Sequence, residues 1–305
     1  MTSNDRSQPM YQDISNVSDR STPSLEEGTS DEQTSEKTYP TAGILLIGNE
    51  LLSGKIKDEN AAFLAERLRE LGVVLERVLV IPDRVELIGA EVREMSARYD
   101  YVFTSGGVGP THDDVTLEGI AAAFDVELYL EPKLTDILKT YFAERLTDAH
   151  LRMARIPHGS TLIWPPENPW PVYTYHNVFI FPGVPSILQS KFNAIAERFR
   201  AATIYLRSVY VSTQEGDIAD NLERLERDLD VMIGSYPRTH RDADYRVRVT
   251  VESRNAEQVD LAVDQLLSSL DEDALVRLDP PVSPNELPKI DTLIESDDPA
   301  ETSRG

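Results

Sequence analysis

The most constraining feature of this sequence is the apolar run at 42–48, Ala-Gly-Ile-Leu-Leu-Ile-Gly, in which no polar residue interrupts the apolar ones. A strand buried on one face alternates apolar and polar side chains, whereas a strand buried on both faces is apolar throughout. Strands of the second kind occur in parallel sheets with helices on both faces. Apolar runs and segments of helical periodicity keep alternating from 41 to 202, which predicts an α/β fold with a doubly wound, mostly parallel sheet.

The further elements of this first part follow from the same alternation. Asp58 is placed to cap a helix that ends at Gly72. The pattern predicts strands at 73–81, 101–104, 127–130, 161–164, 172–175 and 178–181, and helices at 84–98, at 115–124, from Pro132, and after Pro185 to about residue 200.

The pattern changes after this helix and predicts a second, smaller module over 203–278. Its expected order is strand, helix, strand, strand, helix, strand, which is the split β-α-β of ferredoxin-like folds, here α+β. The segments are 204–213, 215–229, 231–236, 245–252, 256–270 and 274–278. We therefore expect domains at 41–202 and 203–278, between disordered acidic tails at 1–40 and 279–305.

Charge and composition exclude several classes of function. The formal net charge is -23, of which residues 1–40 carry -5 and residues 271–305 carry -7, and so an acidic body remains between them. Nucleic acid is not an expected partner, because its binding needs clustered Lys and Arg. No window approaches the roughly 18 apolar residues of a membrane span. The absence of Cys excludes disulfides and thiolate zinc sites, and it fits a cytoplasmic location.

Three loops at the carboxyl ends of predicted strands are the candidate ligand site. They are residues 48–54, 105–114 and 181–186. The middle loop, Ser-Gly-Gly-Val-Gly-Pro-Thr-His-Asp-Asp, has three glycines that allow close backbone approach and leads to a helix start, a combination that favours a phosphate. The residues expected to bind phosphate or ligand are Gly48, Asn49, Ser105, Gly106, Gly107, Gly109, Thr111, Gly183 and Ser186.

Carboxylates beside a phosphate site repel the ligand unless a cation intervenes. We therefore expect Asp113, Asp114 and Glu50 to hold a divalent ion, Co²⁺ or Mg²⁺, and to act as the catalytic residues. Thr111 and Asp114 also match the Thr-x-x-Asp capping box of a helix start. His112 is the one histidine that falls in a candidate loop, and Trp164, Trp170, Tyr173 and Tyr175 are expected to pack around the proline-rich segment.

Taken together, the three loops resemble the MoaB/Mog-type molybdopterin-binding domain, in the branch found in CinA-like proteins (competence/damage-inducible protein A) and at the N-terminus of eukaryotic FAD synthases. The Gly-Gly-x-Gly-Pro-Thr-x-Asp-Asp string at 106–114 is the specific part, and Gly48-Asn-Glu-Leu-Leu52 and Phe181-Pro-Gly-Val-Pro185 support it in combination. The likeness spans roughly 42–202 and continues more faintly into the smaller module. Asp113 and Asp114 match the acidic pair of the family motif, whereas Asn49 stands where an acidic residue is common.

The resemblance implies a metal-dependent phosphohydrolase that cleaves a nucleotide pyrophosphate of the ADP-ribose or FAD type, with possible use of K⁺. The alternative is a molybdopterin-binding module of molybdenum cofactor biosynthesis without hydrolysis, and a third is a scaffold that only oligomerises. We expect a small-molecule nucleotide or pterin as ligand and a homo-oligomer, a dimer or a trimer. Neither the amidohydrolase domain of CinA proteins nor the nucleotidyltransferase domain of FAD synthases is expected within 305 residues.

Overall fold

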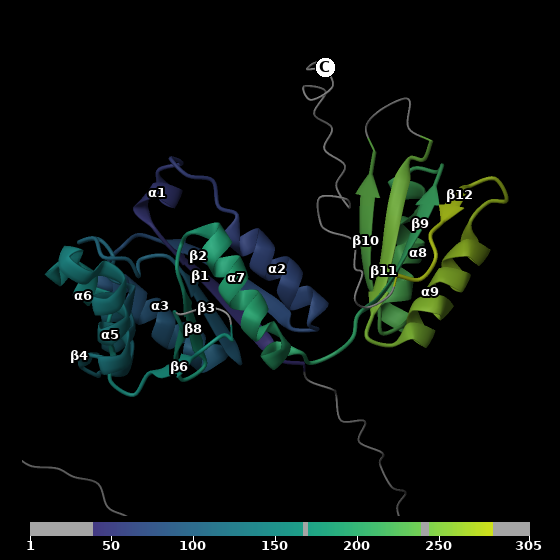
Figure 1. The fold of residues 1–305 in the computed structure, drawn as a ribbon. Helices are drawn as coiled ribbons and strands as arrows, with labels where there is room; N and C mark the ends of the chain where they lie inside the picture. The colour runs from purple at the N-terminus through teal and green to yellow at the C-terminus, as the bar shows by residue number, and fades with distance from the viewer. Residues whose placement is uncertain (1–38, 167–169, 239–243, 283–305) are drawn as a thin grey trace, which may run out of the picture. The chain divides into compact units, whose positions relative to one another are not determined.

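The computed structural model describes residues 39–166, 170–238 and 244–282 (Figure 1). Most of the expected tails lies outside these residues. Of the second tail, residues 279–282 are described, and Asp279 and Val282 donate backbone hydrogen bonds to the carbonyls of Ser208 and Leu206 at 3.0 and 3.2 Å. No helix among the described residues is long and apolar enough to cross a membrane.

A six-stranded sheet organises the first part of the chain, as the sequence predicts. The strand order is β2-β1-β3-β8-β7-β6. The first four of these strands are parallel to one another. At one edge of the sheet, β7 pairs antiparallel with β8, and β6 pairs antiparallel with β7. The strands are β1 (Thr41–Ile47), β2 (Val74–Ile81), β3 (Tyr101–Ser105), β6 (Thr161–Ile163), β7 (Val172–Tyr175) and β8 (Val178–Phe181).

Burial on both faces of β1 explains its uninterrupted apolar run. Leu45 and Ile47 pack into one core with α3 (Val85–Arg98), α4 (Thr116–Phe124) and α5 (Pro132–Phe142). Ile44 and Leu46 pack into the opposite core with α2 (Asn60–Glu70) and α7 (Pro185–Ile195). The sheet is therefore covered by helices on both faces, and the doubly wound prediction is confirmed (Figure 1).

The second sheet confirms the predicted order of the smaller module. All its neighbouring strands are antiparallel, in the order β10-β11-β9-β12. Alternate valines of β9 and β11 pack against the two helices of this module on one face of the sheet. The elements are β9 (Tyr205–Val211), α8 (Glu215–Asp228), β10 (Met232–Pro237), β11 (Val247–Ser253), α9 (Ala256–Ser269) and β12 (Leu275–Leu278).

Several short elements were not predicted. The strand expected at 127–130 is β4 (Leu128–Leu130), and it pairs outside the main sheet with β5 (Arg155–Pro157). The helix expected to reach about residue 200 ends at Ile195 and continues as a 3-10 turn over Ala196–Phe199. The unpredicted helices are α1 (Asn49–Leu52), α6 (Asp148–Arg152) and the 3-10 turn Ala143–Arg145. Their shortness explains the omission, because three to five residues carry too little periodicity to detect.

Candidate functional site

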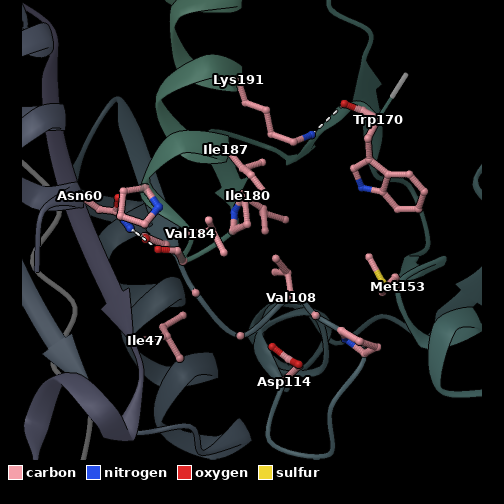
Figure 2. A pocket seen from close by; sticks show the side chains of 18 of the residues that line it. Ile47, Asn60, Val108, Asp114, Met153, Trp170, Ile180, Val184, Ile187 and Lys191 are labelled. Atoms are coloured by element: carbon pink, nitrogen blue, oxygen red, sulfur yellow. Dashed lines mark hydrogen bonds between the residues drawn. The ribbon is translucent and has the colours of Figure 1, made fainter. Parts of the chain in front are cut away.

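A cavity of about 930 Å³ opens where β1, β3 and β8 end, at the place predicted for the ligand (Figure 2). Its floor is made by Ile47, Ser105 and Ile180, and α5 and α7 contribute side walls. Most of the lining side chains are apolar. The charged ones are Glu50, Lys57, Asp58, Glu59, Asp114 and Lys191.

Seven of the twelve candidate residues line this cavity. They are Glu50, Ser105, Gly106, Gly107, Gly109, Asp114 and Gly183. The other five lie in the same loops but outside the lining: Gly48, Asn49, Thr111, Asp113 and Ser186. His112 points away, with 93% of its side chain exposed.

Two glycines of the middle loop, which the sequence pattern related only to ligand binding, are required by the fold itself. Gly106 has a φ of 103°, and a Cβ there would lie 2.1 Å from the Ile47 carbonyl oxygen. Gly107 has a φ of 65°, and a Cβ would lie 2.3 Å from Thr116 Oγ1. Close contacts with the end of β1 and the start of α4 thus explain both residues without any ligand.

Backbone hydrogen bonds decide which amides of this loop remain for a ligand. Gly106 donates to the Phe181 carbonyl at 3.1 Å, so this amide is not available to a phosphate. Within the described chain, no hydrogen bond uses the N–H of Gly107 or Gly109. The N–H of Val108 is unused there as well, so three consecutive lining residues have backbone donors left over for a ligand.

The predicted capping box exists as a hydrogen-bonded turn but does not start the helix. Thr111 donates its N–H to Asp114 Oδ2 at 2.8 Å. Helix α4 begins later, at Thr116. Thr116 closes the loop instead, because its hydroxyl donates to the Gly106 carbonyl at 2.8 Å and its N–H to that of Gly107 at 2.9 Å.

The acidic pair is held by one hydroxyl. Thr111 Oγ1 lies 2.5 Å from both Asp113 Oδ1 and Asp114 Oδ2, so its single hydrogen is shared between the two carboxylates. The bond from Thr111 lowers the pKa of Asp113, with smaller contributions from a backbone N–H and from His112. Asp114 Oδ1 accepts no hydrogen bond from the described residues and is free to contact a ligand.

A fourth carboxylate near the site, Asp83, was not predicted from the sequence. It follows β2 and accepts the N–H of Asn49 at 2.8 Å. Partial burial raises its pKa, and the negative charges of Glu50 and Asp113 raise it further. The signal in the sequence was its position directly after a parallel strand, where the ends of neighbouring strands meet.

Asn60 connects two of the three loops from the start of α2. Its side chain is 4% exposed and lines the cavity. Nδ2 donates to Ser105 Oγ at 2.9 Å and to the Gly183 carbonyl at 2.8 Å, whereas Oδ1 has no partner in the described part of the chain. The predicted role of Asp58 is confirmed in part: it accepts the N–H groups of Asn60 and Ala61, although Glu59 is the residue that precedes the helix.

The aromatic residues divide between packing and the cavity. Tyr173 and Tyr175 are buried in the core, as expected, and Tyr173 donates its hydroxyl to the Met153 carbonyl at 3.1 Å. Burial raises the pKa of Tyr173. Trp164 is 40% exposed, and Trp170 lines the cavity as well as packing against the core.

Lys191, on α7, is a cavity residue that was not predicted from the sequence. Its ammonium donates to the carbonyls of Trp170 and Pro171, at 2.8 and 2.6 Å. Burial lowers its pKa to about 8.

Together, the fold and the cavity define a class of protein: α/β domains that receive their ligand between three loops at the carboxyl ends of parallel strands. Residues 43–201 match the family described as probable molybdopterin binding domain, and residues 203–279 match the FAD synthase middle domain. The chain belongs to this MoaB/Mog-type family, in its CinA-like branch.

Three similar proteins illustrate the extent of the likeness. A protein of Archaeoglobus fulgidus is 37% identical over 223 residues, covering 73% of this chain and 94% of that protein. A probable FAD synthase of Caenorhabditis elegans is 32% identical over 255 residues, 74% of this chain and 49% of the synthase. This chain therefore spans about half the length of the synthase. The solved structure of CinA from Thermoplasma acidophilum is 31% identical, covers 52% of this chain and 98% of its own, and has a TM-score of 0.48.

Proposed function

We propose that this chain binds a nucleotide pyrophosphate in the three-loop cavity and hydrolyses it with the help of a divalent ion. The observation that carries the proposal is the juxtaposition, in one cavity, of free loop amides and two carboxylates, Glu50 and Asp114. The homology to FAD synthases supports a dinucleotide of the FAD or ADP-ribose type as substrate.

The phosphates belong at the glycine loop. The N–H groups of Gly107 and Gly109 supply neutral donors, which suit an anion in a protein region that is acidic overall. Gly183 brings a third loop close to this position, because a Cβ there would lie 3.3 Å from Gly106 Cα. A Cβ at Gly107 or Gly109 would meet Thr116 Oγ1 at 2.3 Å or Asp114 Oδ2 at 2.7 Å, so a side chain at either position would displace the loop that carries these amides.

The carboxylates fit a metal ion that is shared with the phosphates. Among the described residues, no group of three His, Cys, Asp or Glu side chains is placed to hold a metal alone. Mg²⁺ needs no such cage, since it is commonly bound by one or two carboxylates and the substrate phosphates. Glu50 and Asp114 would hold the ion, with Asp113 and Asp83 adding negative charge nearby. Bound there, Mg²⁺ or Co²⁺ would neutralise phosphate charge and activate water.

The protein's own residues have separable roles in this proposal. Thr111 orients Asp114 so that Oδ1 stays free, and Asp83 fixes the start of α1 through the N–H of Asn49. Glu50 packs over Gly48, where a Cβ would lie 2.6 Å from Oε1, and this keeps its carboxylate near the cavity. In this proposal Glu50 serves either as a ligand of the ion or as the base that accepts a proton from the attacking water.

Product analysis tests the proposal. The purified protein is incubated with ADP-ribose or with FAD, with and without Mg²⁺, Co²⁺ and K⁺, and AMP is measured by chromatography. We expect metal-dependent AMP release that chelation abolishes and that Asp114→Asn reduces at least tenfold. Glu86→Gln, an exposed carboxylate change on α3, is the matched control. AMP formation no faster than in a blank without enzyme would overturn the proposal.

A pterin-binding function without hydrolysis is the second candidate. The description of the matching family and the largely apolar cavity wall favour it. Pterin fluorescence that co-purifies with the protein from its native host, together with no turnover of either dinucleotide, would replace hydrolysis by this function.

A further inference from the structure

Lys191 places a buried ammonium group at one end of the cavity. Lys191 is 4% exposed, although it lines the cavity. In Figure 2, Lys191 and Trp170 lie on one side of the cavity and Asp114 on the other, with Val108, Ile180 and Ile187 between them. The cavity therefore has a cationic, apolar end and an end with the glycine loop and the carboxylates.

One of the three N–H donors of the Lys191 ammonium group has no acceptor among the described residues. An ammonium group has three N–H donors and no acceptor. Two of them are used by the carbonyls of Trp170 and Pro171. No ion pair joins Lys191 to a carboxylate within the described residues, and no third acceptor contacts its Nζ there. A buried charge in this condition is costly unless another partner completes it.

The surroundings identify what could complete it. The other charged groups of the cavity wall lie in the segment 50–59 and at Asp114. The titratable residue of β7 that lines the cavity is Tyr173, which is neutral because burial raises its pKa. The side chains nearest the cationic end are apolar or aromatic: Trp170, Ile187, Met153 and Ile180. Such walls accept a flat heterocycle, and an acceptor oxygen on it would complete the hydrogen bonds of the ammonium group.

We propose that Lys191 is a specificity-determining residue, which donates its third N–H to an acceptor oxygen on the ring-bearing part of the ligand while the phosphates lie at the glycine loop. This inference rests on the proposed function only in placing the ligand in this cavity. It does not depend on hydrolysis.

This arrangement couples ligand binding to the protonation of Lys191. Burial lowers the pKa of Lys191 to about 8, so at pH 8.5 much of the free protein carries a neutral amine. A neutral amine has two hydrogens, and the two carbonyls use both. An acceptor oxygen favours the ammonium form, and ligand binding at pH 8.5 is therefore accompanied by uptake of a proton.

Calorimetric titration tests the inference with FAD and with ADP-ribose, which lacks the flavin ring. Both are titrated in EDTA, so that no metal-dependent hydrolysis interferes, and in two buffers of different ionisation enthalpy. We expect wild-type protein to take up a fraction of a proton on binding FAD at pH 8.5 and almost none at pH 6.5. We expect Lys191→Met to weaken FAD binding about tenfold, to change ADP-ribose binding less than twofold, and to abolish the proton uptake.

The wild-type comparison of pH 8.5 with pH 6.5 needs no variant and stands even if Lys191→Met folds poorly. Lys133→Met, an exposed charge change on α5, is the control. If Lys191→Met weakens the binding of FAD and of ADP-ribose equally, or leaves the proton uptake unchanged, Lys191 has a purely structural role and the inference is overturned. Protein that binds FAD with these properties but never releases AMP would leave the role of Lys191 standing and overturn the proposed hydrolysis instead.

Discussion

The amide nitrogen of Asn60 donates to the hydroxyl of Ser105 at 2.9 Å, a hydrogen bond between side chains 45 residues apart that ties the start of α2 to the end of β3. The same nitrogen donates to the Gly183 carbonyl. One buried side chain thus holds the second and third loops of the cavity together.

Replacing Asn60 by Ala should therefore affect both stability and ligand binding. The Ser105 hydroxyl and the Gly183 carbonyl would lose a buried partner, which costs about 1–3 kcal/mol in the free energy of unfolding. The loops would also lose their common anchor, so the affinity for FAD should fall. Urea unfolding and FAD titration measure the two effects, with Asn193→Ala, an exposed change on α7, as control. Wild-type values for both would show that Asn60 is not the anchor.

Gly106 and Gly54 both have a positive φ, but replacing them by Ala should cost very different amounts of folding stability. In Gly106→Ala the new Cβ would meet the Ile47 carbonyl oxygen at 2.1 Å, and the loop must move. We expect a loss of at least about 2–3 kcal/mol and of ligand binding. Gly54 has a φ of 69° but nothing within 4 Å of its would-be Cβ, so Gly54→Ala should cost only about 1 kcal/mol. Thermal unfolding of both variants makes the comparison, and similar costs would contradict it.

How far the sequence predicts this site depends on the range of the interactions involved. The buried strand at 42–48, the glycine loop and the order of the second module are local patterns, and each was predicted. The start of α4 was predicted to within one residue, at 115 against the observed Thr116, but its capping was not: Thr111 and Asp114 form the expected pair, while Thr116 closes the loop through carbonyls ten and nine residues away. A local capping signal cannot show which of two threonines begins the helix.

Lys191 in the cavity wall and Asp83 beside the first loop were not predicted either, and the properties of both have long-range causes. Lys191 is buried because the carbonyls of Trp170 and Pro171, some 20 residues earlier in the chain, fold over its ammonium group. Asp83 acquires its raised pKa from partial burial and from charges on two other loops. In the sequence both are ordinary charged residues, one in an amphipathic helix and one after a strand.

Lys191 also predicts how stability depends on pH. Its pKa is about 8 in the folded protein against an ordinary value of 10.5, so the unfolded chain binds more protons between these two values. The free energy of unfolding should therefore rise with pH from about 8 to about 10.5, by up to about 3 kcal/mol. Other groups titrate in the same range, so the measured quantity is the difference between wild-type protein and Lys191→Met in urea unfolding. A difference that does not change with pH would mean that Lys191 keeps its charge when folded.

Replacing Asp83 should have opposite effects on the binding of the metal ion and on the binding of the anionic ligand. Replacing it by Asn keeps an oxygen that can accept the Asn49 N–H and removes one negative charge from the neighbourhood of Glu50 and Asp113. Without metal, less repulsion should let Asp83→Asn bind FAD more tightly than wild-type protein. With Mg²⁺ or Co²⁺, the weaker negative field should raise the metal concentration needed for half-maximal AMP release several-fold. Titrations of FAD in EDTA and of metal at saturating FAD, each beside Glu86→Gln, measure both. The two effects have opposite signs because the charge repels the ligand and attracts the ion, and a change of the same sign in both titrations would rule out a metal shared between these carboxylates and the phosphates.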